Sequence, residues 1–228
     1  MSTPTHRPVP LFLSALIALF AALVALAVSG GHDAGAHAGQ VHATPAAVTA
    51  PELALRQEMR RLWEDHITWT RLAVISLTTD GPDTQATVAR LLRNQADLGN
   101  AITPFYGAAA GAKLTRLLRE HIAIAADLIA VARKGDQAGV TAQQSRWRAN
   151  ADGIAAFLSG ANPTSWKAGE TRAMMRDHLR LTTDEVVARL TANWSADVRA
   201  YDRIHRQILR MADMLSAGLV AQFPARFR

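Results

Sequence analysis

Cysteine is absent from the 228 residues of the chain. This absence excludes disulfide bonds, thiol catalysis and a lipid-modified N-terminal cysteine, so an exported form of the chain must be held together by packing. No stretch alternates apolar and polar residues with a period of two, and no glycine-rich turn follows a strand-like run. These two absences argue against a β-sheet and against a phosphate-binding loop. The sequence therefore predicts an all-α protein.

A single long apolar run stands near the N-terminus. Residues 11–28 are apolar except for Ser14, and Arg7 is the only lysine or arginine that precedes them. About 18 residues is just enough for a helix that spans a bilayer, whereas the alanine-rich composition is also typical of a cleaved signal peptide. We therefore expect residues 1–30 to be either a membrane anchor or a signal peptide. Both place the rest of the chain outside the cytoplasm, in a single-pass membrane protein or in a periplasmic or secreted one.

Residues 31–51 are rich in glycine, alanine and histidine, and they predict a flexible tether because they contain little to bury. The tether contains His32, His37 and His42. They are compatible with a simple polar linker; the alternative is that they capture a divalent ion. Residues 52–228 then form one domain. The formal net charge of the chain is +6, and its basic residues are scattered among acidic ones. This pattern fits a solvated surface, so we expect the membrane as a partner through the N-terminal segment and no nucleic acid.

Helical spacing runs through the whole domain. Leu55, Met59 and Leu62 begin an apolar stripe that steps by three and four, and similar stripes recur along the chain. Turn-forming clusters such as residues 80–82 separate the stripes. The expected helices cover residues 52–79, 83–103, 110–133, 138–158, 169–191 and 195–222. Only the weak break at 192–194 separates the last two, which leaves a single kinked rod as an alternative.

An acid followed by histidine recurs at nearly constant spacing. The three pairs are Asp65-His66, Glu120-His121 and Asp177-His178, and their histidines stand 55 and 57 residues apart. A second marker that ends in Ala-Asp follows each pair, in the triplets 95–97, 150–152 and 211–213. Internal similarity with such a period is the signature of a repeated supersecondary unit. The sequence therefore predicts a six-helix bundle built from three helical-hairpin pseudo-repeats, preceded by one hydrophobic helix.

All three histidines fall on the apolar faces of their helices, at about 100° per residue. Buried polar groups need hydrogen-bond partners. Glu185 lies on the same face as His178, and a buried carboxylate is costly unless it is neutral, paired or bound to a metal. Asn94 and Asn150 point inward from the second and fourth helices, whereas the aspartates of the markers on these two helices point outward. Bundle metal sites are built from inward side chains of facing helices, and imidazole with carboxylate suits Zn, Fe or Cu. One hypothesis is therefore a divalent metal site with ligands His66, His121, His178 and Glu185, surrounded by Asn94 and Asn150.

Other interpretations remain open. Each histidine can be a core residue that is hydrogen-bonded to a neighbouring threonine, to Asn94 or to a backbone carbonyl, which makes the domain a structural or protein-interaction module. The cluster can instead hold a small organic ligand, or support metal-assisted hydrolysis if a coordination position is open. Met174, Met175, Met211 and Met214 are candidate thioether ligands for copper(I), although methionine at helical spacing usually fills a core. No nucleophile–base pair is visible, so a binding protein is favoured over an enzyme.

Several segments resemble a family of bacterial all-helical proteins. The resemblance covers residues 55–223 and rests on Leu62-Trp63-Glu64-Asp65-His66 with Trp69-Thr70-Arg71, on Phe105-Tyr106-Gly107, on Asn162-Pro163 and on the Ala-Asp markers. Members are sometimes labelled glycosyltransferase or acetylglutamate kinase, so the resemblance implies a helical fold and, by these labels, transfer of a sugar or a phosphoryl group. Such transferases use an Asp-x-Asp metal clamp or glycine-rich phosphate loops, and neither motif is present. The family thus supplies an expected fold and no catalytic residue.

Overall fold

The computed structural model describes residues 47–228. The expected anchor or signal peptide and nearly all of the expected tether lie outside the described residues. Within this range the chain forms helices and the turns between them, with no strand, which confirms the all-α prediction. None of these helices combines the length and the apolar composition that a bilayer span requires.

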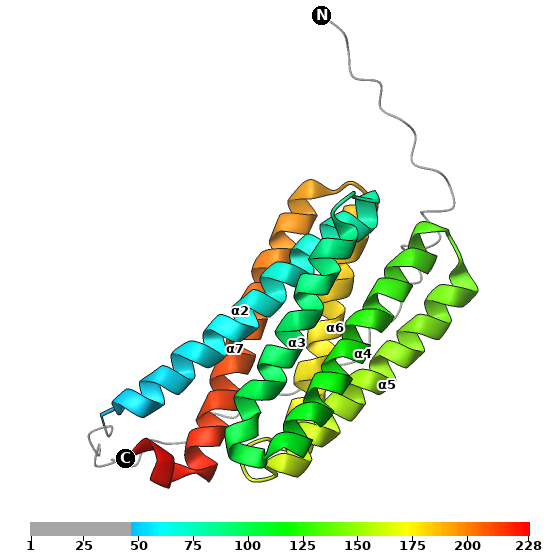
Figure 1. Ribbon diagram of the computed structural model, residues 1–228. Coiled ribbons are helices and arrows are strands. Elements are labelled where there is room, and N and C mark those ends of the chain that lie inside the picture. Colours follow the sequence, from blue (N-terminus) through cyan, green and yellow to red (C-terminus); the bar gives the residue numbers. More distant parts are fainter. Residues whose placement is uncertain (1–46) are drawn as a thin grey trace, which may run out of the picture.

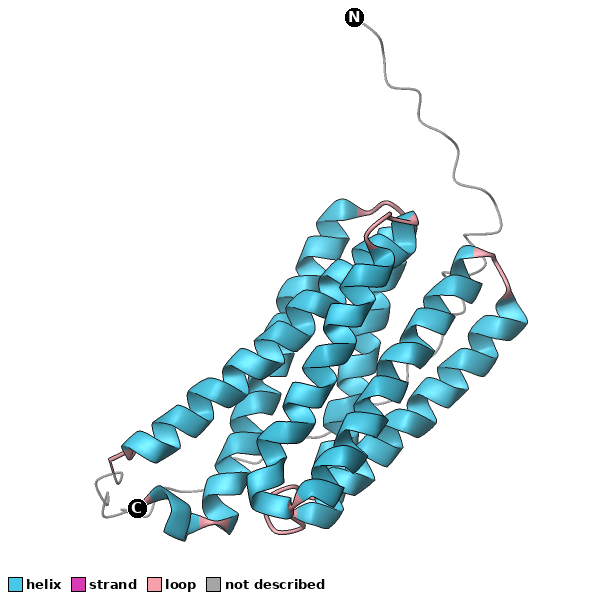
Figure 2. Cartoon of the chain, viewed as in Figure 1, coloured by secondary structure: helices cyan, strands magenta, loops and turns pink. Residues whose placement is uncertain are grey.

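Local sequence explains where the helices of residues 47–228 begin and end. Thr49 accepts a hydrogen bond from the backbone N–H of Glu52 at the start of the first helix, which ends at Asp80 in the left-handed conformation. Asp136 and Asn193 cap two later helices in the same way as Thr49. The elements, shown in Figure 2, are α2 (Ala50–Thr79), α3 (Thr84–Tyr106), α4 (Ala108–Arg133), α5 (Gln137–Ala161), α6 (Ala168–Leu190), α7 (Trp194–Gln222) and the 3-10 helix η1 (Pro224–Phe227).

Two details differ from the expected helices. α3 continues through Pro104 to Tyr106 instead of ending at Thr103. Pro104 lies in the last turn of α3, where the missing N–H removes one intrahelical hydrogen bond and does not interrupt a longer helix. The alternative of one kinked rod is excluded, because the chain turns between α6 and α7 at Ala192, with φ of 54°, and the two helices pack side by side.

The six helices close into a ring in chain order (Figure 1). Each helix packs against the one that follows it, and α7 returns to pack against α2. α2 also contacts α4 and α6 across the middle of the ring. The first helices of the three hairpins, α2, α4 and α6, therefore face one another, and each of them carries one of the recurring histidines.

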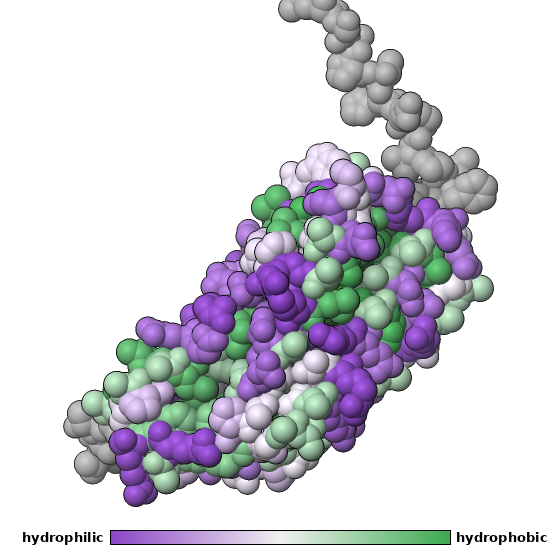
Figure 3. Space-filling model, in the orientation of Figure 1, coloured by the Kyte–Doolittle hydropathy of each residue, from purple (hydrophilic) through white to green (hydrophobic). Residues whose placement is uncertain are grey.

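Glycine sets the separation of α3 and α4 at one end of the bundle. A Cβ atom on Gly99 would lie 2.6 Å from the carbonyl oxygen of Gly111, and one on Gly111 would lie 2.7 Å from the carbonyl oxygen of Gly99. No side chain fits at this separation, so the contact requires glycine on both helices. Toward the other end the two helices separate (Figure 1), and hydrophobic surface is visible over them in Figure 3.

Candidate functional site

The three recurring histidines meet inside the ring of helices. His66 on α2, His121 on α4 and His178 on α6 are each at most 4 % exposed. The ring centre of His178 lies 6.0 Å from that of His66 and 6.1 Å from that of His121. Side chains from three separate hairpins therefore form one group of neighbouring imidazoles, which we call the histidine cluster.

A side-chain amide from the second helix of each hairpin lies against each imidazole. The three contacts share the ring atom Nδ1, distances between 2.9 and 3.3 Å and a separation of 29 residues in sequence: His66 with Gln95, His121 with Asn150 and His178 with Gln207. An amide nitrogen in each hairpin also donates to the carbonyl four residues before the histidine: Asn94 to Leu62, Asn150 to Leu117 and Gln207 to Met174. In each hairpin, side-chain amides of the second helix thus contact the histidine ring and also hydrogen-bond the backbone of the first helix.

These bonds fix the protonation of two rings. The amide nitrogens of Asn150 and Gln207 donate to carbonyls, so their oxygens face the imidazoles and accept from Nδ1–H. A neutral imidazole has one N–H, and therefore Nε2 of His121 and Nε2 of His178 each carry a lone pair. Nε2 of His121 is buried and has no hydrogen-bond partner among residues 47–228. The cluster thus contains a buried acceptor that the described part of the protein does not satisfy.

His66 has a different environment from the other two. Nε2 of Gln95 donates to the carbonyl of Leu91 and faces Nδ1 of His66, so this ring accepts at Nδ1 and carries its proton on Nε2. The neighbouring Asn94 makes the bond to the Leu62 carbonyl instead. The cluster therefore holds one Nε2–H and two Nε2 lone pairs.

All three imidazoles are neutral at pH 7. Burial lowers the pKa of His66 to about 3, and the neighbouring His178 and His121 act in the same direction. Burial and the proximity of His178 lower the pKa of His121 to about 3 as well. The pKa of His178 is also lowered, chiefly by burial. Neutral imidazole is the form that binds metal ions, so the three rings have the protonation state of ligands.

A small cavity adjoins the histidine cluster, on the side toward the N-termini of α2 and α6. Its volume is about 30 Å³, which is room for an ion or a few atoms of solvent and not for an organic ligand. Three methionines, Met59, Met175 and Met211, line it together with the three histidines. Trp63 is also part of its wall, and the indole N–H of this residue has no partner among the described residues. The remaining walls are leucine and isoleucine, and no acidic side chain of residues 47–228 lines the cavity.

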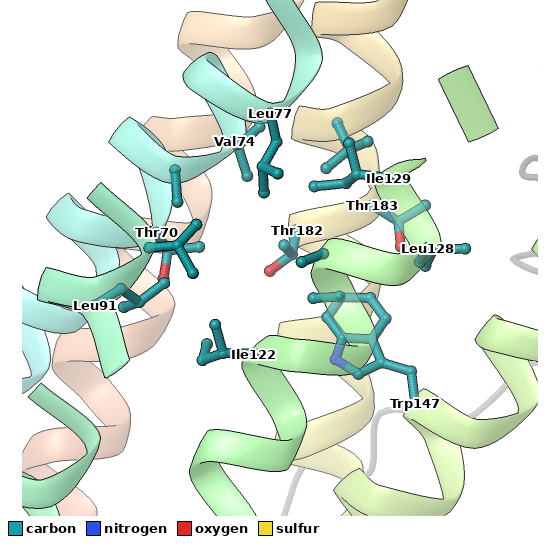
Figure 4. A pocket seen from close by; sticks show the side chains of 15 residues that line it. Thr70, Val74, Leu77, Leu91, Ile122, Leu128, Ile129, Trp147, Thr182 and Thr183 are labelled. Carbon is teal, nitrogen blue, oxygen red and sulfur yellow. The ribbon is translucent and has the colours of Figure 1, made fainter. Parts of the chain in front are cut away.

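A second cavity, of about 40 Å³, lies on the opposite side of the cluster (Figure 4). Aliphatic side chains from α2, α3, α4 and α6 form most of its wall. Thr70 and Thr182, which also line it, donate their hydroxyls to the backbone carbonyls of two cluster histidines. Trp147 separates it from His121, with ring centres 5.2 Å apart. Apolar walls on both sides account for the strong desolvation of the imidazoles.

Glu185 does not join the histidine cluster. It follows His178 by two turns of α6, about 10 Å along the helix axis, and its Oε1 accepts from Arg71 at 2.7 Å. Arg71 also pairs with Asp197 at 2.6 Å, and Arg189 reaches Asp197 at 3.3 Å. Burial raises the pKa of Glu185 against the attraction of Arg71. Burial opposes ionisation of Asp197 too, but the two arginines outweigh it and lower its pKa. The expected fourth ligand therefore belongs to a charged network that is centred on Arg71.

The amides around the cluster were only partly predicted. Asn94 and Asn150, expected beside the rings, are both buried there. The expected outward position of the aspartates is also observed for Asp152, which pairs with arginines on α6. Gln207 was missed altogether, and Gln95 entered the prediction only as the first residue of the marker at 95–97. The constant separation of 29 residues from each histidine was the sequence signal that identifies both.

No family model, curated protein or solved structure matches the chain. The resemblance to a family of helical proteins therefore stays a prediction. Within residues 47–228, no three histidine, aspartate or glutamate side chains are arranged closely enough, as they stand, to hold a metal ion. Any function of the cluster must be inferred from its burial, its hydrogen bonds and its lone pairs.

Proposed function

We propose that the domain binds a single transition-metal ion, with the imidazoles of His66, His121 and His178 as ligands. The observation that carries the proposal is Nε2 of His121, which is buried beside another imidazole and has no partner among residues 47–228. A buried acceptor that lacks a hydrogen bond costs about 1–3 kcal/mol, and a bound ion removes this cost. The amides on Nδ1 add support, because metal-binding histidines usually hold their other ring nitrogen in such a bond.

The spacing of the rings is near the range that a shared ion requires. With metal–nitrogen distances of about 2 Å, two imidazoles on one ion have ring centres roughly 5–6 Å apart. The two separations that involve His178, 6.0 Å to His66 and 6.1 Å to His121, lie at and just beyond the upper end of this range. No group of described side chains has the spacing of a finished site, so binding calls for closer approach of the three rings. It also calls for movement of the His66 proton from Nε2 to Nδ1, the atom that Gln95 now faces. Oδ1 of Asn94, which accepts from Nε2 of Gln95 at 3.3 Å, is the acceptor we propose for the moved proton.

The proposed site works outside the cytoplasm, in the storage, delivery or sensing of the ion. The apolar run at residues 11–28, with a basic residue before it, supports this location. We also propose that the three hairpins are copies of one unit. The support is the shared separation of 29 residues between each histidine and its amide.

Metal binding is tested with the full chain, in a background that removes the N-terminal histidines as competing ligands: His6, His32, His37 and His42 are replaced by asparagine. Dialysis against Zn(II), Co(II) or, with a reductant, Cu(I), followed by elemental analysis, should give one ion per chain for at least one metal. His121→Ala should abolish this binding. The control His205→Ala removes a histidine that pairs with Glu64 near the surface, and it should bind as the background does. Protein free of every metal, or equal loading of the His121 variant, refutes the proposal.

A structural role is the second candidate. It is favoured by the observation that no group of described acidic or histidine side chains has the spacing of a finished metal site. In this case the amide bonds specify the register of the hairpins, and the cluster is a polar element of the core. It predicts that His121→Ala lowers thermal stability while added metal leaves the melting temperature of both proteins unchanged. A metal-dependent rise of the melting temperature that is lost in His121→Ala contradicts it.

A further inference from the structure

We infer that the ion is copper(I), held by the histidine cluster together with methionine thioethers of the adjoining cavity. This inference rests on the proposed function and adds the identity of the ion. Met59, Met175 and Met211 line the same cavity as the three imidazoles. They are at most 4 % exposed, whereas Met174 and Met214 are only partly buried and do not line it.

The three methionines come from different helices and converge on one volume. Met59 precedes His66 by two turns of α2, Met175 precedes His178 by about one turn of α6, and Met211 lies on α7. Met175 and Met211 are therefore the proposed thioether ligands, whereas Met59, which is as far along its helix from His66 as Glu185 is from His178, forms part of the cavity wall. Thioether and imidazole together are a donor set for soft ions, and thioether in particular selects copper(I) over zinc(II) or iron(II).

Charge points to the same ion. Within the described part of the chain, the lining of the cavity supplies neutral donors only and includes no acidic side chain. The nearest buried carboxylate on α6, Glu185, is already paired with Arg71. The Born cost of transfer into an apolar medium grows with the square of the charge, so a divalent ion costs roughly four times as much as a monovalent one. A site without anionic ligands therefore favours a monovalent ion.

The size of the cavity agrees with a bare ion. A volume of about 30 Å³ is room for an ion with at most one or two waters. Copper(I) can complete its coordination with a small number of nitrogen and sulfur ligands and without a water ligand. The apolar walls then exclude solvent from the ion.

The test compares copper(I) with zinc(II) in the full chain that carries asparagine at the four N-terminal histidines. Copper(I) affinity is measured anaerobically by competition with bicinchoninate, and zinc(II) affinity by competition with a chromogenic chelator. We expect the dissociation constant for copper(I) to be at least 100-fold lower than that for zinc(II). Met211→Leu and Met175→Leu, which keep the volume of the side chain, should each weaken copper(I) binding about tenfold or more and leave zinc(II) binding unchanged. Met214→Leu is the matched control and should change neither.

X-ray absorption at the copper edge gives an independent readout. Sulfur in the first coordination shell, reduced in Met211→Leu and retained in Met214→Leu, supports the inference. One zinc(II) or cobalt(II) ion that depends on His121 and shows no copper(I) preference overturns the copper assignment and leaves the proposed metal site intact. Copper(I) bound through nitrogen alone, with Met211→Leu unchanged, overturns the thioether ligands. Absence of all metals overturns both the inference and the proposed function.

Discussion

His121 donates its Nδ1–H to Oδ1 of Asn150 over 2.9 Å, and the same amide donates to the carbonyl of Leu117, four residues before the histidine. This pair of bonds fixes the orientation of the ring and its tautomer at once. It leaves Nε2 as a lone pair in the interior, where nothing in residues 47–228 bonds to it. The chemistry proposed for the domain follows from this relationship and from its counterparts in the other two hairpins.

Removal of the amide should destabilise the metal-free protein. Asn150→Ala leaves the Nδ1–H of His121 without an acceptor, and we expect the free energy of unfolding to fall by about 1–3 kcal/mol. Asp152→Ala, two residues along the same helix, breaks only half-exposed ion pairs with Arg172 and Arg176, and it should cost less than about 1 kcal/mol. Urea unfolding measures both. Equal effects of the two substitutions contradict the importance of the amide.

Stability of the metal-free protein should depend on the two strongly shifted imidazoles. His66 and His121 have a pKa of about 3 in the folded state and an ordinary value of about 6.5 when unfolded. Between these values the unfolded chain binds protons that the folded chain does not. Each ring therefore lowers the free energy of unfolding by about 1.4 kcal/mol for every unit that the pH falls below about 6.5.

The matched variant for this dependence is His121→Leu. Glu185, whose pKa is raised, acts in the opposite direction in both proteins, so the difference in slope isolates His121. Urea unfolding across this pH window, with a chelator present, should show a slope about 1.4 kcal/mol per pH unit smaller for His121→Leu. His205→Ala should keep the slope of the parent. Parallel curves for the parent and His121→Leu mean that the imidazole is protonated in the folded state.

The charged network between α2, α6 and α7 should respond strongly to loss of its arginine. Arg71→Met leaves Glu185 and Asp197 buried without their main partner, and we expect a loss of about 3–5 kcal/mol. Arg60→Met breaks an exposed pair with Asp213 and should cost less than about 1 kcal/mol. Calorimetry near neutral pH distinguishes the two. A loss below about 1 kcal/mol for Arg71→Met shows that the two carboxylates find other partners.

Replacement of Gly99 or Gly111 by alanine should destabilise the protein. Gly111→Ala places Cβ 2.7 Å from the Gly99 carbonyl, so we expect the helices to be forced apart at a cost of at least about 1–3 kcal/mol. In Gly153→Ala the nearest atom is 4.0 Å away, and the better helix propensity of alanine should stabilise the protein by about 0.5–1 kcal/mol. Thermal unfolding shows whether each substitution raises or lowers the stability. Stabilisation by Gly111→Ala contradicts the close helix contact.

The imidazole tautomers of the metal-free protein should differ within the cluster. Long-range proton–nitrogen correlation spectra at neutral pH should show His66 protonated on Nε2, and His121 and His178 protonated on Nδ1. The reason is that Gln95 offers His66 a donor, whereas Asn150 offers His121 an acceptor. Addition of the bound ion should convert His66 to the Nδ1–H form. The same tautomer for all three rings before metal is added contradicts the assignment.

The sequence predicted the helices and the inward direction of the histidines because both depend on spacing within a single helix. Apolar stripes at three and four residues and turn-forming clusters such as residues 80–82 are local signals. His66, His121 and His178 share their faces with leucine or methionine, so their burial follows from the helical wheel. The predicted end of the second helix at Thr103 was wrong, because a proline in the last turn does not end a helix as one in its middle would.

The partners of buried groups could not be predicted in the same way. The link between Arg71 and Glu185 spans 114 residues, and only the packing of α2 against α6 brings the two together. The separation of 29 residues from His178 marks Gln207 in the sequence, but its contact with the ring depends on the packing of α7 against α6. The convergence of three methionines on the histidine cavity likewise depends on the arrangement of three helices.

The central claim is that the histidine cluster holds a metal ion. Anomalous diffraction from crystals of the full chain grown with copper(I), and separately with zinc(II), tests it most directly. The account predicts one anomalous peak, stronger for copper(I), at about 2 Å from Nε2 of His66, His121 and His178, with Nδ1 of His121 still bonded to Asn150. Imidazoles that stay apart with no anomalous peak between them would contradict it.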